Sequence, residues 1–214
     1  TQVREPDPAS PGTSSYYTYY TYDVLNHLTG VNMPRPSGTQ TRTFNYSGPY
    51  LMSAQNPENG TVTYTYGTGG LLASKTDAKG QQVQYSYDSY GRLSQVRHYA
   101  LNLQGTLVED PCQQVNLTYD SNTVSGFESL AGRLATRTYS VCENPNGTTT
   151  LRTDFTDMFG YTAAGQVTKK RLRVARTLYQ NWTPVTVYRD LDGSWTYTEE
   201  KMTGVTYPSG SGGQ

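Results

Sequence analysis

The residues of this chain that could do acid–base chemistry are a few closely spaced carboxylates and two histidines. Paired carboxylates serve glycosidases as general acid and base, and a histidine can act as a base or as a metal ligand. The candidates are Asp154 with Asp157, Asp190 with Asp192, Glu199 with Glu200, His27 and His98. We interpret His27 as a hairpin-turn residue and His98 as the end of a strand, because no catalytic or metal-binding motif accompanies them.

The motifs of familiar catalytic sites are absent from the sequence. It contains no Gly-x-Ser-x-Gly, His-Glu-x-x-His or Cys-x-x-Cys motif and no phosphate-binding glycine loop. Asp190-Leu-Asp-Gly193 begins like a calcium-binding loop, but its ligand spacing stops after two acids, and we interpret it as a β-turn. The sequence therefore predicts a protein that is not an enzyme, with no cofactor and no metal site.

Tyrosines and arginines at strand spacing are the remaining candidates, and they would bind rather than react. In Tyr64-Thr-Tyr66 and Tyr85-Ser-Tyr87 both rings lie on one face of an extended strand. Such rings could stack on sugars, and Arg171 and Arg173 could contact an acidic glycan. Alternatively, the tyrosines form a cross-strand ladder that stabilises a sheet, and the arginines lie on a solvated strand face. We favour the ladder and keep glycan binding as the alternative.

The composition indicates the elements that carry these residues. The 214 residues include 20 Tyr and 32 Thr, whereas only 34% are hydrophobic and 16% charged. Tyr and Thr favour strands over helix interiors, which excludes a helical bundle and a doubly wound α/β enzyme. The formal net charge of zero gives no general attraction to nucleic acid. No apolar run approaches the length of about 20 residues that a membrane helix needs, so we predict neither nucleic-acid binding nor membrane insertion.

A hairpin repeat runs through the sequence. In its clearest unit, Tyr85–Val96, a first strand ends at Tyr87, Asp88 and Gly91 flank the reversal, and Arg92-Leu93 starts the return strand. The second aromatic residue of successive units falls at positions 22, 46, 66, 87, 119, 161 and 197. The motif residues are Tyr20, Tyr22, Asp23, Tyr64, Tyr66, Tyr85, Tyr87, Asp88, Gly91, Arg92, Leu93, Tyr119, Asp120, Gly132, Arg133 and Leu134. The array is regular as far as residue 100 and carries insertions afterwards.

The pattern Tyr-x-Tyr-Asp-x-x-Gly-Arg-Leu resembles the YD repeat of the Rhs group, which includes bacterial Rhs toxins, the C components of insecticidal toxin complexes, and the teneurins. The resemblance covers residues 16–207. It implies a long β-sheet ribbon that spirals into a hollow shell, and in the toxin members this shell encloses a toxic polypeptide. The sequence lacks the Asp-Pro- and Gly-rich segment that closes family shells, so we expect it to form part of a shell.

We therefore predict an all-β fold, in which an antiparallel β-hairpin meander forms a curved or spiralling YD-repeat sheet. Strands are expected near residues 62–66, 71–75, 83–87 and 92–98, with no helix longer than about two turns. Residues 1–15, rich in Pro, Ser and Gly, are expected to be a linker. Residues 16–207 are expected to be the repeat region, and residues 208–214 a flexible tail.

The two cysteines, Cys112 and Cys142, are expected to form a disulfide. When the register of the clearest hairpin is applied to the unit from Tyr119 to Leu134, Cys112 lies opposite position 141, which brings Cys142 within reach. A disulfide would indicate an oxidising compartment. We accordingly expect the protein to be secreted or displayed at the cell surface.

These features together predict a structural role. We expect a β-sheet wall that encloses or displays another polypeptide, within a larger exported and toxin-related protein. The first alternative is a glycan-binding adhesion module, and the second is an extracellular fibre or tube that assembles through open sheet edges. The expected partners are the rest of a larger polypeptide, further copies of the chain, or glycans.

Overall fold

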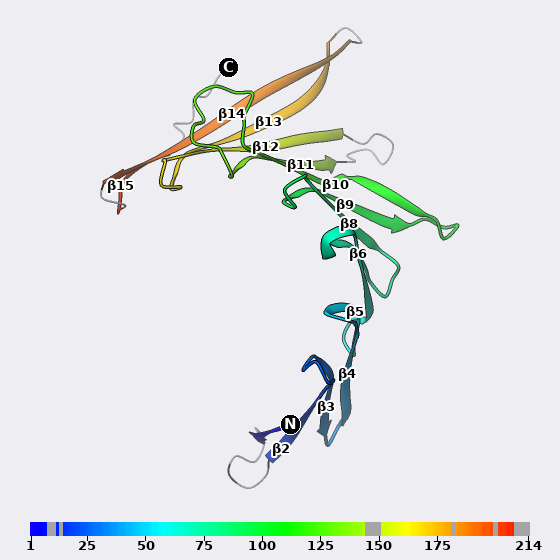
Figure 1. The fold of residues 1–214 in the computed structure, drawn as a ribbon. Helices are drawn as coiled ribbons and strands as arrows, with labels where there is room; N and C mark the ends of the chain where they lie inside the picture. The colour runs from blue at the N-terminus through cyan, green and yellow to red at the C-terminus, as the bar shows by residue number, and fades with distance from the viewer. Residues whose placement is uncertain (8–11, 13–14, 144–150, 181–182, 199–200, 208–214) are drawn as a thin grey trace. The chain divides into compact units, whose positions relative to one another are not determined.

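The computed structural model of the chain describes residues 1–7, 12, 15–143, 151–180, 183–198 and 201–207. These residues form one sheet of 15 strands whose spatial order is the order of the chain (Figure 1). The strands are β1 (Gln2–Pro6), β2 (Ser15–Tyr22), β3 (Leu28–Arg35), β4 (Gly38–Ser47), β5 (Tyr50–Asn56), β6 (Gly60–Tyr66), β7 (Leu72–Thr76), β8 (Gln82–Tyr87), β9 (Leu93–Leu101), β10 (Leu107–Tyr119), β11 (Leu134–Glu143), β12 (Leu151–Tyr161), β13 (Val167–Gln180), β14 (Thr183–Thr198) and β15 (Lys201–Thr206). The predicted all-β antiparallel meander is confirmed.

The helix content also agrees with the sequence. Within the described residues the only helical element is a single 3₁₀ turn, η1 (Thr68–Gly70), between β6 and β7. No helix in this part of the chain is long and apolar enough to cross a membrane. The four strands expected between residues 62 and 98 are present as β6, β7, β8 and β9.

The N-terminal segment differs from its predicted linker character. Residues 2–6 form β1, which pairs with β2 from Gln2 opposite Tyr19 to Pro6 opposite Ser15. Side chains add to the pairing, since Arg4 Nε donates to Ser15 Oγ at 2.8 Å. The linker prediction rested on a composition rich in Pro, Ser and Gly, whereas the backbone bonds to β2 determine the conformation of residues 2–6. Residues 8–11, 13–14 and 208–214 lie outside the described residues, and the predicted domain boundaries remain a prediction.

A five-residue turn closes many of the hairpins. At Asp88, the carboxylate Oδ1 accepts the N–H groups of Tyr90 and Arg92, both at 2.9 Å. The N–H of Gly91 donates to the Asp88 carbonyl at 3.0 Å, with Gly91 at a positive φ of 76°. This φ is accessible to glycine without steric cost, which explains the Asp-x-x-Gly spacing of the motif.

The same turn recurs at both ends of the strands. Asp77 accepts the N–H groups of Lys79 and Gln81, and Asn102 accepts those of Gln104 and Thr106, all between 2.9 and 3.0 Å. The turn at Asn102 was not predicted, although Asn-x-x-Gly was visible in the sequence. Asn shares with Asp the side-chain oxygen that this turn requires.

A β-bulge precedes the second tyrosine of the repeat. The pairing register shifts by one residue immediately before this position in six described hairpins. The resulting pairs are Tyr22 with Leu28, Tyr46 with Leu51, Tyr66 with Leu72, Tyr119 with Leu134, Tyr161 with Val167 and Tyr197 with Met202. The extra residue lies on the return strand, as Thr29 does between Leu28 and Gly30, and a bulge bends the strand that carries it and increases its twist.

The chain divides into two compact units with small hydrophobic cores. The first comprises residues 1–85 and 99–108, and its buried hydrophobic residues are Val31, Ala54 and Val62. The second comprises residues 86–98 and 109–214, and Phe127 and Leu130 pack there with Ala135 and Met158. Phe127 and Leu130 come from the insertion between Asp120 and Gly132. Because so few apolar side chains are buried, contacts between neighbouring hairpins must supply much of the stability.

Candidate functional site: a clasp between neighbouring hairpins

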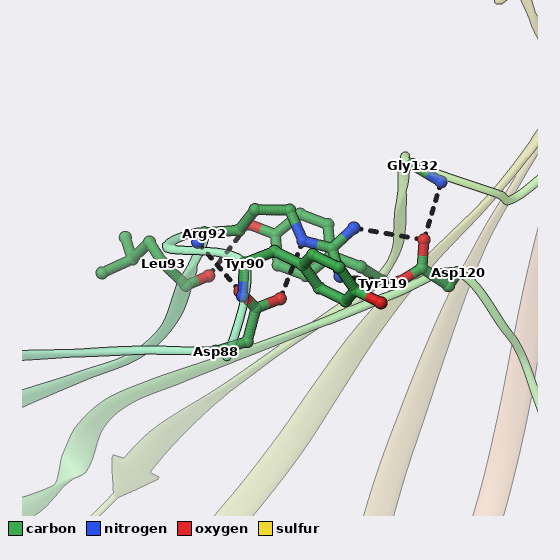
Figure 2. Close-up of polar contacts among 7 residues, drawn as sticks. All are labelled: Asp88, Tyr90, Arg92, Leu93, Tyr119, Asp120 and Gly132. Carbon is green, nitrogen blue, oxygen red and sulfur yellow. Dashed lines mark hydrogen bonds and ion pairs between the residues drawn. The ribbon is translucent and has the colours of Figure 1, made fainter.

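The arginine of the repeat motif joins two hairpins. Arg92 Nε donates to Asp88 Oδ2 at 2.7 Å within its own turn. Its two terminal nitrogens donate to the carboxylate of Asp120, 28 residues further along, at 3.1 and 2.6 Å. Figure 2 shows the guanidinium extending between the two carboxylates, with Asp120 also accepting the N–H of Gly132. This two-point contact has the geometry of a strong arginine–carboxylate pair.

A tyrosine of the next hairpin completes this contact. The Arg92 guanidinium lies 4.3 Å from the ring centroid of Tyr119 and 5.0 Å from that of Tyr90. The hydroxyl of Tyr119 donates to the carbonyl of Leu93 at 2.9 Å. Tyr119 therefore contacts both Arg92 and Leu93, the residues that start the return strand of the preceding hairpin. We call this arrangement the inter-repeat clasp. In it, the side chain at the arginine position of one hairpin contacts the ring of the second tyrosine of the following hairpin. The hydroxyl of that tyrosine donates to the carbonyl of the residue at the leucine position, which directly follows the arginine position.

The clasp keeps its carboxylates ionised. Side-chain hydrogen bonds from Arg92, together with the N–H of Gly132, lower the pKa of Asp120. Burial acts to raise the pKa of Asp88, but the hydrogen bonds from Arg92 and Tyr90 outweigh it and lower the pKa. Both aspartates in turn raise the pKa of Arg92.

A second clasp in the same unit uses Arg133 and Tyr161. The Arg133 guanidinium lies 5.6 Å from the Tyr161 ring centroid, and the Tyr161 hydroxyl donates to the Leu134 carbonyl at 2.9 Å. Here Thr162 replaces the aspartate, and Arg133 instead donates to the backbone carbonyls of Thr162 and Ala163 at 3.0 and 2.8 Å. The clasp thus tolerates loss of the carboxylate because backbone oxygens replace it.

The first unit builds its clasps from other side chains. His27 occupies the arginine position after Asp23, with Nδ1 2.9 Å from Asp23 Oδ2, and its ring stacks on Tyr46 at 4.6 Å. The predicted turn role of His27 is therefore incomplete, because the imidazole also contacts the next hairpin. In the next hairpin Tyr50 occupies the arginine position, and its ring centroid lies 4.8 Å from that of Tyr66.

The hydroxyl-to-carbonyl bond is the part of the clasp that recurs with the least variation. Tyrosine hydroxyls donate to the carbonyl of the residue at the leucine position of the preceding hairpin, at 2.9 to 3.0 Å. The pairs are Tyr66 to Leu51, Tyr119 to Leu93, Tyr161 to Leu134 and Tyr197 to Val167. The sequence predicted a ladder of rings but not this bond, because it joins successive repeats rather than residues of one repeat.

The remaining motif residues have varied surroundings. Tyr64, Tyr66, Tyr85 and Tyr87 are half-buried, whereas the Tyr22 side chain is 46% exposed. Rings that are half-buried in a sheet offer less surface for stacking sugars than free rings would. Glycan contact by these tyrosines remains a prediction.

Arg171 and Arg173 lie in a charge ladder across β13 and β14. Arg171 binds Asp192 with Nη2–Oδ2 at 2.6 Å and approaches Asp190 at 3.1 Å, while Arg173 donates twice to Asp190 at 2.8 Å. These arginines lower the pKa of both aspartates. The interpretation of Asp190–Gly193 as a β-turn was wrong, because this segment belongs to β14. Arg171 and Arg173 lie on a strand, as interpreted, and their guanidinium groups are paired with aspartates there. Both segments are strand, and the register places Arg171 opposite Asp192 and Arg173 opposite Asp190.

The other carboxylate pair does not form an acid–base site. Asp154 and Asp157 are three residues apart on one strand, so their side chains lie on opposite faces. Asp154 accepts from Ser140 and Arg152. Asp157 is 2% exposed and binds Arg137 and, at 3.1 Å, Lys170. Glu199 and Glu200 lie outside the described residues.

The Asp157 cluster was not predicted, because its members come from three strands. Arg137 lies directly opposite Asp157 in the pairing of β11 with β12. Predicting this contact from the sequence would have required an accurate register between β11 and β12. Within the described residues, no three side chains of His, Cys, Asp or Glu are grouped as a metal site would need.

Cys112 and Cys142 form the predicted disulfide, with their Cα atoms 5.4 Å apart. The described pairing of β10 with β11 ends at Val115 opposite Tyr139, and continuing it places Cys112 directly opposite Cys142. A cavity of about 530 Å³, lined in part by Cys112, Arg137 and Tyr139, lies beside the bond. The disulfide therefore joins the two strands beyond the end of their ladder.

The pKa directions predict how stability depends on pH. Asp23, Glu58, Asp88, Asp120, Asp190 and Asp192 all have lowered pKa values in the folded chain. A lowered folded-state pKa adds stability above the unfolded value of about 4, and this stability is lost as the pH falls through the folded value. We expect the free energy of unfolding to decrease as the pH is lowered from about 5 to 2.

Urea unfolding at a series of pH values measures this dependence. The Asp88→Asn/Asp120→Asn double variant should show a shallower decrease than the parent, because its clasp no longer titrates. Equal slopes for the parent and the double variant would contradict the role of these carboxylates.

The fold and the clasp together define a class of protein: a YD-repeat sheet, in which tyrosine and arginine positions lock successive hairpins. Comparison with protein families agrees, because the teneurin YD-shell family matches residues 47–170, more than half of the chain. The chain belongs to the teneurin YD-shell family.

Searches of other known proteins add a structural likeness. No curated protein matches the chain. Similar solved structures include the TcdB2-TccC3-Cdc42 crystal structure, with 14% identity and a TM-score of 0.39 over 84% of this chain and 10% of that one. The Photorhabdus luminescens Tc holotoxin pore with a TccC3 mutation has 16% identity and a TM-score of 0.34 over 85% of this chain and 12% of that one. The chain thus spans about a tenth of the length of these solved chains.

Proposed function

We propose that this chain is a non-catalytic segment of a β-sheet wall, which encloses or displays another polypeptide within a larger exported or cell-surface, toxin-related protein. The inter-repeat clasp is the observation that carries this proposal. Its side chains form contacts between neighbouring hairpins, so the tyrosines and arginines that take part in it stabilise the sheet. Membership of the teneurin YD-shell family supports the same role.

Charged side chains also pair with one another within the sheet. Arg92, Arg171 and Arg173 each bind aspartate carboxylates. An arginine that is already paired has less attraction for an acidic glycan, because the carboxylate compensates its charge. This pairing favours the wall over a site for acidic sugars. The disulfide supports an exported protein, since such bonds persist in oxidising compartments.

The wall and the glycan-binding module differ in what the tyrosines do, and this difference can be tested. In the Tyr64→Ala/Tyr66→Ala variant we expect a clearly lower melting temperature, because the Tyr66 ring contact with Tyr50 and its bond to Leu51 are lost. Tyr207→Ala is the matched control, because Tyr207 is 79% exposed, and its melting temperature should change little.

A glycan array on the parent and both variants completes the experiment. If the chain is a structural wall, we expect no sugar binding that depends on Tyr64 and Tyr66. Loss of a defined sugar interaction in a variant that melts at the parent temperature would overturn the proposal and support the adhesion module.

A further inference from the structure

The cavity beside the disulfide belongs to the second unit and is lined by residues of β10 and β11. Its volume is about 530 Å³, and Val115, Arg137 and Tyr139 are among its lining residues. Val115 lies directly opposite Tyr139 in the pairing of the two strands. Pockets for small ligands commonly measure about 300–1,000 Å³ and combine apolar walls with a few polar groups. The cavity therefore has the size and the kind of lining that a small ligand needs.

The ring of Tyr139 is held in place by its neighbours. It stacks on Phe155 of β12, with the ring centroids 5.3 Å apart and an angle of 12° between the planes. The Arg137 guanidinium lies 5.2 Å from the Tyr139 centroid. Because these contacts already restrain the ring, a ligand that packs on it costs little side-chain entropy. Tyr139 and Val115 together suit a flat apolar group.

Arg137 brings an excess of positive charge to the cavity. Its Nε and Nη2 both donate to Asp157 Oδ2, and Lys170 Nζ lies 3.1 Å from the other oxygen of the same carboxylate. The Asp157 side chain is only 3% exposed. Two cations thus share one buried carboxylate, so one positive charge is left uncompensated. Arg92 differs, because two carboxylates compensate its single charge.

Two donors in the lining are available to a ligand. Arg137 makes no bond from Nη1 to any described residue, and its side chain is 46% exposed. The Tyr139 hydroxyl likewise has no bond within the described part of the chain. The carboxylates of Asp110 and Asp154 do not line the cavity, and each already accepts hydrogen bonds. Donors and an excess of positive charge favour an anion.

From this arrangement we propose that the cavity binds a small organic anion, a carboxylate attached to a flat apolar ring system. The carboxylate would accept from Arg137 Nη1, on a guanidinium that Asp157 holds in place, and the ring system would pack against Tyr139 and Val115. Hydrogen bonds between ionised groups are about twice as strong as those between neutral ones. The inference goes beyond the proposed wall function and does not depend on it.

Calorimetric titration of the parent chain with 2-naphthoate tests this site. The matched probe is 2-naphthamide, which has the same ring system and no charge. We expect naphthoate to bind at least about tenfold more tightly than the amide, because the ionised acceptor strengthens the bond to the guanidinium. In nuclear magnetic resonance spectra, naphthoate should shift the backbone amide signals of residues 112–115 and 137–140.

Three variants assign the binding to the cavity. Arg137→Gln leaves Asp157 paired with Lys170 and should weaken naphthoate binding at least about tenfold, since the donor and its charge are lost. Arg176→Gln is the matched control, because this exposed arginine of β13 does not line the cavity, and its affinity should change less than about twofold. Val115→Phe leaves the Asp157 cluster intact and should also abolish tight binding by filling the cavity.

The outcomes that would overturn the proposal are distinct from one another. Equal affinity for naphthoate and naphthamide would exclude recognition of the charge, and absence of binding at millimolar naphthoate would exclude the site. Signal shifts confined to residues outside the cavity would place the ligand elsewhere. If Arg137→Gln fails to fold, the Val115→Phe variant decides, because undiminished binding in a Val115→Phe chain that melts at the parent temperature would overturn the proposal.

Discussion

Removal of the disulfide, in the Cys112→Ser/Cys142→Ser variant, is expected to lower the free energy of unfolding by about 3–4 kcal/mol. The bond closes a loop with a sequence separation of 30, and the chain-entropy model gives this magnitude for such a loop. The loop contains the insertion that supplies Phe127 and Leu130 to the core. We therefore expect the second unit to lose the most stability, which urea unfolding and hydrogen exchange by segment would measure.

Reductant provides the control for this prediction. Dithiothreitol reduces disulfides, so it should destabilise the parent by a comparable amount and leave the double-serine variant unchanged. Parent protein prepared under oxidising conditions should show no free thiol by alkylation and intact mass. Two alkylated cysteines, or equal stability of the parent and the variant, would contradict both the bond and the oxidising compartment.

Tyr119→Ala is expected to lower the free energy of unfolding by about 2–3 kcal/mol, since the half-buried ring and one hydrogen bond are lost together. Tyr119→Phe retains the ring against Arg92 and removes only the donor to the Leu93 carbonyl. That variant should cost about 1 kcal/mol. Thermal and urea unfolding of the two variants would separate the ring from the hydroxyl.

An exposed tyrosine controls for general effects of the substitution. The Tyr188 side chain is 62% exposed, and Tyr188→Ala should cost much less than Tyr119→Ala. If both alanine variants were destabilised equally, the contacts of Tyr119 with the preceding hairpin would have no special importance.

Local features of the fold could be predicted from the sequence because their causes are local. Asp88 and Gly91 are sufficient to define their turn, since the side-chain bonds and the positive φ involve only neighbouring residues. Alternation and the spacing of the tyrosines likewise indicated the strands. The disulfide could be predicted because both cysteines lie in one extended hairpin.

Contacts that depend on an accurate register could not be predicted. Each bulge before a second tyrosine shifts the pairing by one residue, so an error of one residue changes every cross-strand partner. Asp190 and Gly193 show the consequence, because their local turn signal was overridden by pairing with β13, where Gly193 lies opposite Lys170. The N-terminus is a further example. Thr1 and Tyr20 exchange two backbone hydrogen bonds, and the composition of the segment gives no indication of this pairing.

A double-mutant cycle between Arg92 and Tyr119 tests directly whether the motif residues hold one hairpin to the next. The free energy of unfolding would be measured for the parent, Arg92→Ala, Tyr119→Phe, Tyr119→Ala and the two double variants. We expect a favourable coupling of Arg92 with the Tyr119 ring, clearly outside experimental error, and additive effects in a second cycle that combines Arg92→Ala with Tyr188→Ala. Additive effects for Arg92 and Tyr119 as well would contradict the inter-repeat clasp.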